Sequence, residues 1–140
     1  HATRAECHAD RALMHRSIHV VVETTTGILL QRRGFAKDTG AGLWDSACAG
    51  HVEPSETYTD AAVRELGEEL GIVAEPEFVG TCRVVTERET ELCGVHTLRH
   101  DGPFRLELPE LSGLCVFRPD ELPSDVTPAL EQVHQWLARP

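Results

Sequence analysis

The sequence predicts an α/β fold in which two helices cover the faces of a mixed β-sheet, an α/β/α sandwich. Short β-branched runs bounded by turn residues recur along the chain, as expected of strands. Two other segments repeat apolar residues at the period of a helix. Strands and helices in this order build layered domains. With 140 residues, the chain is expected to form a single domain over residues 1–140.

The strands are predicted from runs of Val, Ile and Leu. The first run is IHVVV, and a Thr-Thr-Thr-Gly turn joins it to a returning strand, as in a hairpin. A glycine-containing loop over residues 34–42 then leads into the strand that ends at Gly50. The six predicted strands span residues 18–22, 28–33, 43–50, 77–87, 91–98 and 113–117.

The first helix is predicted over residues 58–70. Thr57 is a suitable N-cap, and Gly71 stands where a helix usually ends. Apolar residues recur every four positions, which predicts a buried stripe. This stripe consists of Ala62, Leu66 and Leu70.

The second helix is predicted over residues 125–137, at the end of the chain. Pro128 stands near its start, where proline is tolerated. Its apolar residues at helical spacing are Leu130, Val133 and Leu137.

Composition and charge exclude several classes of partner. A net charge of −10 argues against binding to nucleic acid or to an anionic membrane, because such proteins are basic. No apolar run approaches the roughly 18 residues of a membrane span. The five cysteines include no CxxC pair and fall largely in apolar segments, so we expect reduced thiols and a cytoplasmic location.

The most specific pattern of the chain lies in residues 50–72. They match, without a gap, the pattern G-x5-E-x7-R-E-U-x-E-E-x-G-U, where U is aliphatic. Chance would match the fixed polar and glycine positions once in about 10^8 placements, given average residue usage. These fixed residues are Gly50, Glu56, Arg64, Glu65, Glu68, Glu69 and Gly71.

Three glutamates of this pattern share one helical face. Glu65, Glu68 and Glu69 are spaced i, i+3 and i+4. Such crowded carboxylates repel one another, and hard oxygen ligands suit Mg2+ or Mn2+. An ordinary solvated acidic face is the alternative. Arg64 stands four residues after Asp60, so these two side chains could also pair.

The stretch resembles the Nudix box. The resemblance implies a Nudix-type sandwich and divalent-metal-dependent cleavage of a small-molecule diphosphate. It implies that the metal ions bind Glu65, Glu68, Glu69, Glu56 and the carbonyl of Gly50. Arg64 would orient a glutamate, and the water that attacks phosphorus would lose its proton to Glu68 or to a glutamate outside the box. We therefore assign the catalytic roles to Glu68, Glu65 and Arg64.

A second resemblance extends beyond the box. The stretches HRSIHV, QRR and WDS are similar to the Nudix branch that contains isopentenyl-diphosphate isomerase and its hydrolase relatives. This branch implies a second metal site, and its ligand types suit Mn2+, Zn2+ or Fe2+. The matching positions are His8, His15, His51, Glu89 and Glu91. Scattered surface or core histidines are the alternative.

The same resemblance implies three substrate-binding residues. Arg33 and Lys37 match positions that contact the diphosphate, although solvated loop charges are the alternative. Trp44 could stack on a base or an isoprenoid, or it could anchor the core.

Two other functions compete with hydrolysis. An isomerase of this branch needs a cysteine directly before the box glycine, and here that residue is Ala49. The neighbouring Cys48 would point to the opposite face of the strand. A nucleotide-sensing module without activity usually loses box glutamates, which are all present. The sequence leaves open the identity of the diphosphate substrate and a homodimer, which is frequent in the family.

Overall fold

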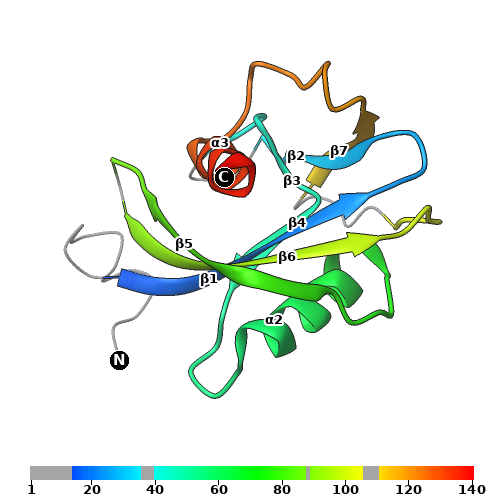
Figure 1. Ribbon diagram of the computed structural model, residues 1–140. Helices are drawn as coiled ribbons and strands as arrows, with labels where there is room; N and C mark the ends of the chain where they lie inside the picture. The colour runs from blue at the N-terminus through cyan, green and yellow to red at the C-terminus, as the bar shows by residue number, and fades with distance from the viewer. Residues whose placement is uncertain (1–13, 36–39, 88, 106–110) are drawn as a thin grey trace.

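The computed structural model describes residues 14–35, 40–87, 89–105 and 111–140. The described strands form a seven-stranded sheet with the order β3-β2-β1-β6-β5, in which β4 also pairs with β1, and β7 with β2 (Figure 1). The elements are β1 (Met14–Glu23), β2 (Ile28–Arg33), β3 (Trp44–Ser46), β4 (Cys48–His51), α2 (Tyr58–Glu65), η1 (Leu66–Leu70), β5 (Glu77–Val85), β6 (Thr90–Arg99), β7 (Leu111–Phe117) and α3 (Pro128–Ala138). Two predicted site residues, His8 and Lys37, lie outside the described residues.

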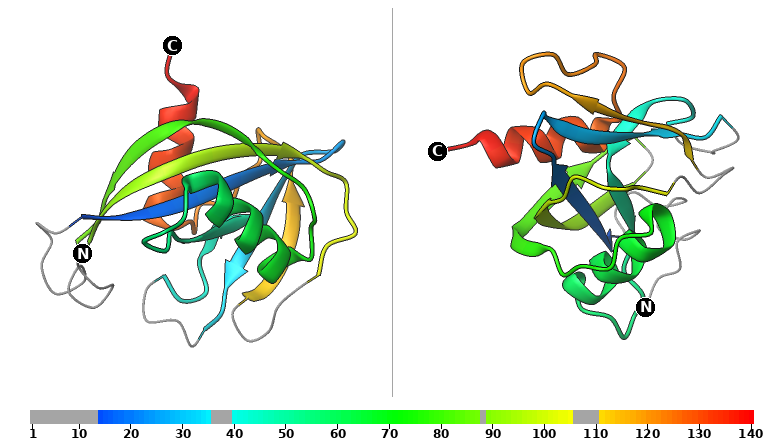
Figure 2. Two further views of the ribbon diagram at one scale, coloured as in Figure 1. Left: turned by 90° about the horizontal axis from the view of Figure 1, so that it is seen from below. Right: turned by 90° about the vertical axis from the view of Figure 1, so that its right-hand side faces the viewer.

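The helices α2 and α3 cover opposite faces of the central strands, which confirms the predicted α/β/α sandwich (Figures 1 and 2). The sheet is mixed because β1 and β6 run parallel over their whole length, whereas the other pairs are antiparallel. None of the helices described is long and apolar enough to cross a membrane.

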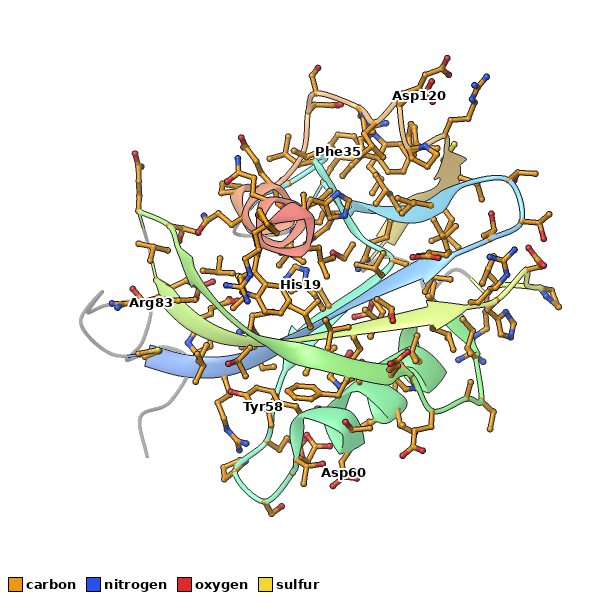
Figure 3. All side chains as sticks on the ribbon, in the orientation of Figure 1. His19, Phe35, Tyr58, Asp60, Arg83 and Asp120 are labelled. Atoms are coloured by element: carbon orange, nitrogen blue, oxygen red, sulfur yellow. The ribbon has the colours of Figure 1, made fainter. Side chains whose placement is uncertain are left out.

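Alternation along β1 separates an apolar face from a polar one. Ile18, Val20 and Val22 are fully buried in the core that packs against α2. Because successive strand residues point to opposite faces, His15, Ser17 and His19 belong to the other face. Figure 3 shows His19 between the sheet and α3, whereas Tyr58 lies between the sheet and α2. His15, Ser17 and His19 therefore lie on the α3 side of the sheet.

Five of the six predicted strands differ in extent from the structure, and two of them differ most. The first strand begins at Met14, four residues earlier than expected. Residues 14–17 belong to the strand because they pair with β6, and Ser17 also pairs with β4, although they are not part of the apolar run on which the prediction was based. The segment 43–50 was predicted as one strand but forms β3 and β4, with Ala47 between them. The chain changes partner there, since β3 pairs with β2 and β4 with β1.

The box helix begins as predicted and ends differently. The Thr57 hydroxyl accepts the Asp60 N–H at 3.0 Å, and Asp60 accepts the Thr57 N–H at 3.3 Å, so Asp60 closes a capping box and is not an Arg64 partner. From Leu66 the helix widens into the π-helical turn η1, and Gly71, at φ 67°, ends it. The predicted stripe is confirmed, because Ala62, Leu66 and Leu70 are fully buried.

The last helix starts three residues later than predicted. Thr127 is its N-cap and accepts the Leu130 N–H at 3.1 Å, so the helix begins at Pro128. Leu130 and Val133 are buried as expected.

Candidate functional site

Arg64 is the centre of the contacts within the box. Its Nε and Nη2 donate to the two carboxylate oxygens of Glu56 at 2.8 and 2.9 Å, a bidentate pair. Its Nη1 donates to Glu65 at 2.8 Å and lies 3.4 Å from Glu68. The Nη2 group also donates to the carbonyl of His51 at 3.1 Å. Arg64 thus holds three of the box carboxylates around one guanidinium.

Gly50 lies directly against Glu65. A Cβ atom at position 50 would stand 2.5 Å from Cδ and 2.6 Å from Oε1 of Glu65. A strand residue with a side chain could therefore not occupy this place unless Glu65 moved. The fixed glycine of the box makes room for its fixed glutamate.

The remaining two glutamates differ in exposure. Glu68 is 61% exposed, whereas Glu69 is half-buried and accepts a hydrogen bond from Nε2 of Gln31 at 3.3 Å. The wider turn of η1 falls on this pair, and such turns are frequent at functional sites. Arg64 therefore contacts three of the box glutamates, Glu56, Glu65 and Glu68. The fourth, Glu69, contacts Gln31 of β2. That these four glutamates bind metal ions stays a prediction.

The loop before α2 is fixed by a residue that the sequence did not single out. Arg16 of β1 donates to the carbonyls of Glu56 and Glu53 at 3.1 and 3.2 Å. Its only sequence signal was its place within the HRSIHV stretch. Arg16 holds the backbone that carries Glu56.

We expect the Glu56–Arg64 pair to make stability depend on pH. The hydrogen bonds from Arg64 lower the pKa of Glu56 from 4.5 to about 2. Ionised Glu56 therefore stabilises the fold above about pH 4.5, and this contribution is lost as the pH falls towards about 2. In metal-free buffer, the difference in melting temperature between wild type and Glu56→Gln should shrink over that window. Glu77→Gln, on the exposed edge strand β5, controls for the removal of one negative charge. If the difference in melting temperature between wild type and Glu56→Gln persisted unchanged to about pH 2, the pairing of Glu56 with Arg64 would be contradicted.

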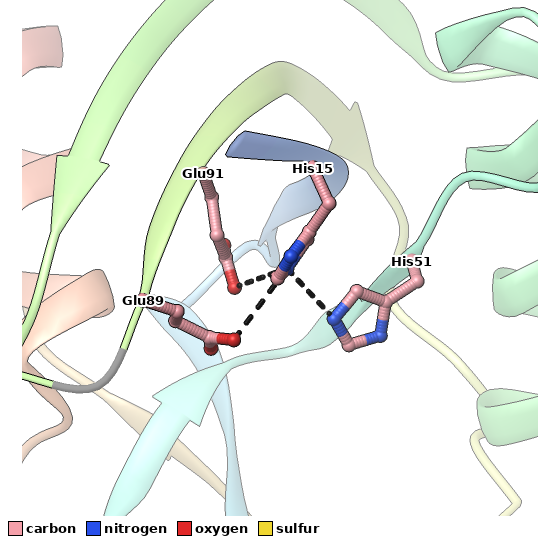
Figure 4. A group of neighbouring side chains, drawn as sticks. All are labelled: His15, His51, Glu89 and Glu91. Carbon is pink, nitrogen blue, oxygen red and sulfur yellow. Dashed lines mark hydrogen bonds and ion pairs between the residues drawn. The ribbon is translucent and has the colours of Figure 1, made fainter. Parts of the chain in front are cut away.

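Four of the five residues predicted for a second metal site lie together (Figure 4). Nε2 of His15 is 3.1 Å from Nε2 of His51, 3.4 Å from Glu91 and 3.6 Å from Glu89. One ligand atom from each of the four lies within 4.8 Å of all the others. The arrangement of imidazoles and carboxylates fits a transition-metal ion.

Strand register brings this cluster together. His15 of β1 stands opposite Glu91 of β6, and Ser17 of β1 stands opposite His51 of β4. The Ser17 hydroxyl donates to Glu91 at 2.7 Å. Burial raises the pKa of Glu91, but hydrogen bonds from His15 and Ser17 outweigh burial and lower it. Glu91 is therefore kept as a carboxylate, and Ser17 is a member of the cluster that the sequence did not single out.

The two clusters share a piece of backbone. The His51 carbonyl accepts from Arg64, and the His51 imidazole contacts His15. One residue of β4 therefore joins the box to the His/Glu cluster. Gly50, the residue before it, faces Glu65, so the two clusters lie on opposite faces of β4.

The predicted substrate residues that can be placed differ in setting. Nη1 of Arg33 lies 3.7 Å from Oδ2 of Asp45. Trp44 is half-buried and packs edge-on against Phe117, with ring centroids 5.1 Å apart. Trp44 thus has the packing of an anchor, and a stacking role stays a prediction.

Cys48 faces the core, as expected from strand alternation. It is fully buried in the cluster under α2, on the side of the strand to which Gly50 also points. Burial, reinforced by the Glu69 and Glu65 carboxylates, raises the pKa of its thiol. Four cysteines are described; all four are free thiols, and Cys82 and Cys93 are also buried.

The fold and the box together define a Nudix protein. Residues 13–137 match the NUDIX domain family, and the chain belongs to this family. It is 32% identical over 142 residues to the uncharacterized Nudix hydrolase YfcD of Shigella flexneri, covering 97% of this chain and 76% of that protein. It is also 33% identical over 146 residues to an isopentenyl-diphosphate delta-isomerase of Nocardia farcinica, covering 96% and 81% of the two chains. A solved MutT Nudix hydrolase of Burkholderia pseudomallei matches with a TM-score of 0.74 and 26% identity, covering 86% and 98%.

Proposed function

We propose that the protein is a metal-dependent pyrophosphohydrolase that cleaves a diphosphate linkage in a nucleoside-diphosphate-like or related substrate. The observation that carries this proposal is the geometry of the complete box. Arg64 fixes Glu56 and Glu65 at hydrogen-bond distance, and Gly50 leaves the space that Glu65 fills. An ordinary acidic helix face has no need of either arrangement.

The donor set fits hard divalent cations. Glu65, Glu68 and Glu69, with Glu56 and the Gly50 carbonyl, offer the oxygen ligands that Mg2+ and Mn2+ prefer. When bound there, such an ion would neutralise the diphosphate and lower the pKa of a water molecule.

Other steps of the reaction are assigned to individual side chains. Arg64 positions Glu56 and Glu65 through short hydrogen bonds. Glu68 is exposed and has only a longer contact of 3.4 Å with Arg64, so we assign it to accept the proton of the attacking water. Arg33 and Lys37 are assigned to the phosphate oxygens. Their positive charge offsets the acidic surroundings that would otherwise repel a polyphosphate.

The proposal is tested with a panel of diphosphates. The panel contains nucleoside di- and triphosphates, dinucleotides, sugar nucleotides and prenyl diphosphates, each incubated with Mg2+ or Mn2+, with the products identified. We expect hydrolysis of at least one class and none with chelator. Binding of a nucleotide with no product over hours would instead indicate a sensing module.

Isomerisation of an isopentenyl diphosphate is the second candidate, because the His/Glu cluster and relatives named isopentenyl-diphosphate delta-isomerase favour it. It predicts interconversion of the two five-carbon diphosphates without phosphate release. The residue before Gly50 is Ala49, and Cys48 is buried in the core, so the thiol that this chemistry requires is missing from its position. We therefore favour hydrolysis.

The His/Glu cluster should bind about one equivalent of Mn2+ or Zn2+. We expect Co2+, added to the metal-free protein, to give d–d absorption bands that His51→Ala removes and that His134→Ala, a histidine of α3, leaves in place. Elemental analysis of the purified protein is the second readout. Equal Co2+ spectra for wild type and His51→Ala would contradict metal binding at this cluster.

A further inference from the structure

Arg33 and Gln31 share a neighbour in Asp45. Asp45 stands opposite Gln31 in the β2–β3 pairing, and Nη1 of Arg33 lies 3.7 Å from Oδ2 of Asp45. Gln31 donates to Glu69 of the box at 3.3 Å. The proposed phosphate-binding arginine is therefore linked to the box through Asp45 and Gln31.

Asp45 is the buried charge beside this arginine. It is 4% exposed and stands opposite Gln31 in the β2–β3 pairing. Its Oδ2 lies 3.7 Å from Nη1 of Arg33. This distance is too long for a hydrogen bond, unlike the 2.8 and 2.9 Å contacts of Arg64 with Glu56. Asp45 attracts the guanidinium without fixing it in a bidentate pair.

The other oxygen of Asp45 is anchored. Oδ1 accepts the Ser46 N–H at 2.8 Å and the Thr127 hydroxyl at 3.1 Å, and Nδ1 of His19 is 3.8 Å away. Thr127 is also the N-cap of α3. Oδ1 of Asp45 is thus bound by the N-cap residue of α3, whereas Oδ2 lies towards Arg33.

The burial of the Asp45 carboxylate indicates that its neighbours must compensate for its charge. A carboxylate that is removed from water needs countercharges and hydrogen bonds, or it destabilises the fold. The hydrogen bonds from Ser46 and Thr127 reach only Oδ1 of Asp45. The oxygen Oδ2 lies towards the guanidinium of Arg33, whose positive charge offsets the buried carboxylate.

We propose that Asp45 is a positioning residue, whose charge draws the guanidinium of Arg33 towards the place of the substrate diphosphate, with Thr127 as the anchor of Asp45. The proposal rests on the proposed function, because it assumes that Arg33 binds phosphate. The proposal connects the N-cap of α3 to the substrate through Thr127, Asp45 and Arg33.

The test measures binding, not turnover. Calorimetry with methylenediphosphonate, a diphosphate analogue that cannot be hydrolysed, is done in the presence of Mg2+. Asp45→Asn keeps the shape and removes the charge, and it should raise Kd about 10-fold, as should Arg33→Ala. The double variant should bind no more weakly than Arg33→Ala, because Asp45 acts through Arg33. Asp120→Asn, in the exposed pair with Arg118, is the matched control and should bind like wild type.

A second variant guards against loss of folding. Thr127→Val removes the hydroxyl that anchors Asp45 and should raise Kd about 3-fold, whereas Thr127→Ser should restore it. Wild-type affinity in Asp45→Asn, or additive effects of Asp45→Asn and Arg33→Ala, would overturn the proposal. So would a wild type that does not bind the analogue. If the wild type binds the analogue and hydrolyses no diphosphate, the proposed function fails while this inference stands.

Discussion

Replacing Glu69 with glutamine should lower kcat/KM for the best diphosphate of the panel by about 10^3-fold. The amide keeps the size of the side chain and removes the charge that we propose to bind the cation. Glu68→Gln should lower kcat by about 10^2-fold, because it removes the residue assigned to accept the proton. The measurement is steady-state hydrolysis at saturating Mg2+.

Stability separates this result from simple unfolding. Removing one charge from a crowded acidic ridge should change the free energy of unfolding by less than about 1 kcal/mol. Glu131→Gln, an exposed acid in the first turn of α3, is the matched control and should hydrolyse at the wild-type rate. Equal rates in wild type, Glu68→Gln and Glu69→Gln would remove these residues from the mechanism.

Gly50→Ala should lower kcat/KM by about 10^2-fold, because a displacement of about 1 Å at a reacting centre has effects of this size. The added Cβ would stand 2.5 Å from Cδ of Glu65, so the carboxylate must leave its place beside Arg64. Since the carboxylate is the end of a flexible side chain, stability should fall by only about 1 kcal/mol.

Removing the side chain that the Cβ meets should cancel the effect on stability. Glu65→Ala removes Cγ, Cδ and Oε1, so Gly50→Ala should cost no further stability in the Glu65→Ala background. Gly113→Ala is the matched control, because its Cβ would meet only Cβ of Arg32, at 3.9 Å. If Gly50→Ala hydrolyses at the wild-type rate, the close packing of Gly50 against Glu65 has no catalytic role.

The parts of the fold that local sequence determines were predicted well. The start of the box helix follows from Thr57 and its end from Gly71, both within reach of the backbone that they satisfy. The π-helical turn was not predicted, because Leu66 and Leu70, four apart, fit a helix of either width. The spacing of apolar residues predicts which side of a helix is buried, but it does not reveal whether one turn is α-helical or π-helical.

Features that depend on strand pairing were predicted less well. The break at Ala47 arises because the chain exchanges β2 for β1 as its partner, and nothing local signals this. The meeting of His15 with Glu91 depends on a parallel register between segments far apart in the sequence. Only the family resemblance pointed to that cluster. The anchoring of Asp45 by Thr127 is likewise non-local, and no spacing rule connects the two residues.

The most direct test is a crystal structure of the protein with Mg2+ and methylenediphosphonate. We predict cations bound to Glu65, Glu68 and Glu69, with oxygens of the diphosphate completing their coordination and Arg33 at the phosphate. A structure in which the analogue or the cations are absent from these carboxylates, and the three side chains point to bulk solvent, would contradict a metal-dependent pyrophosphohydrolase.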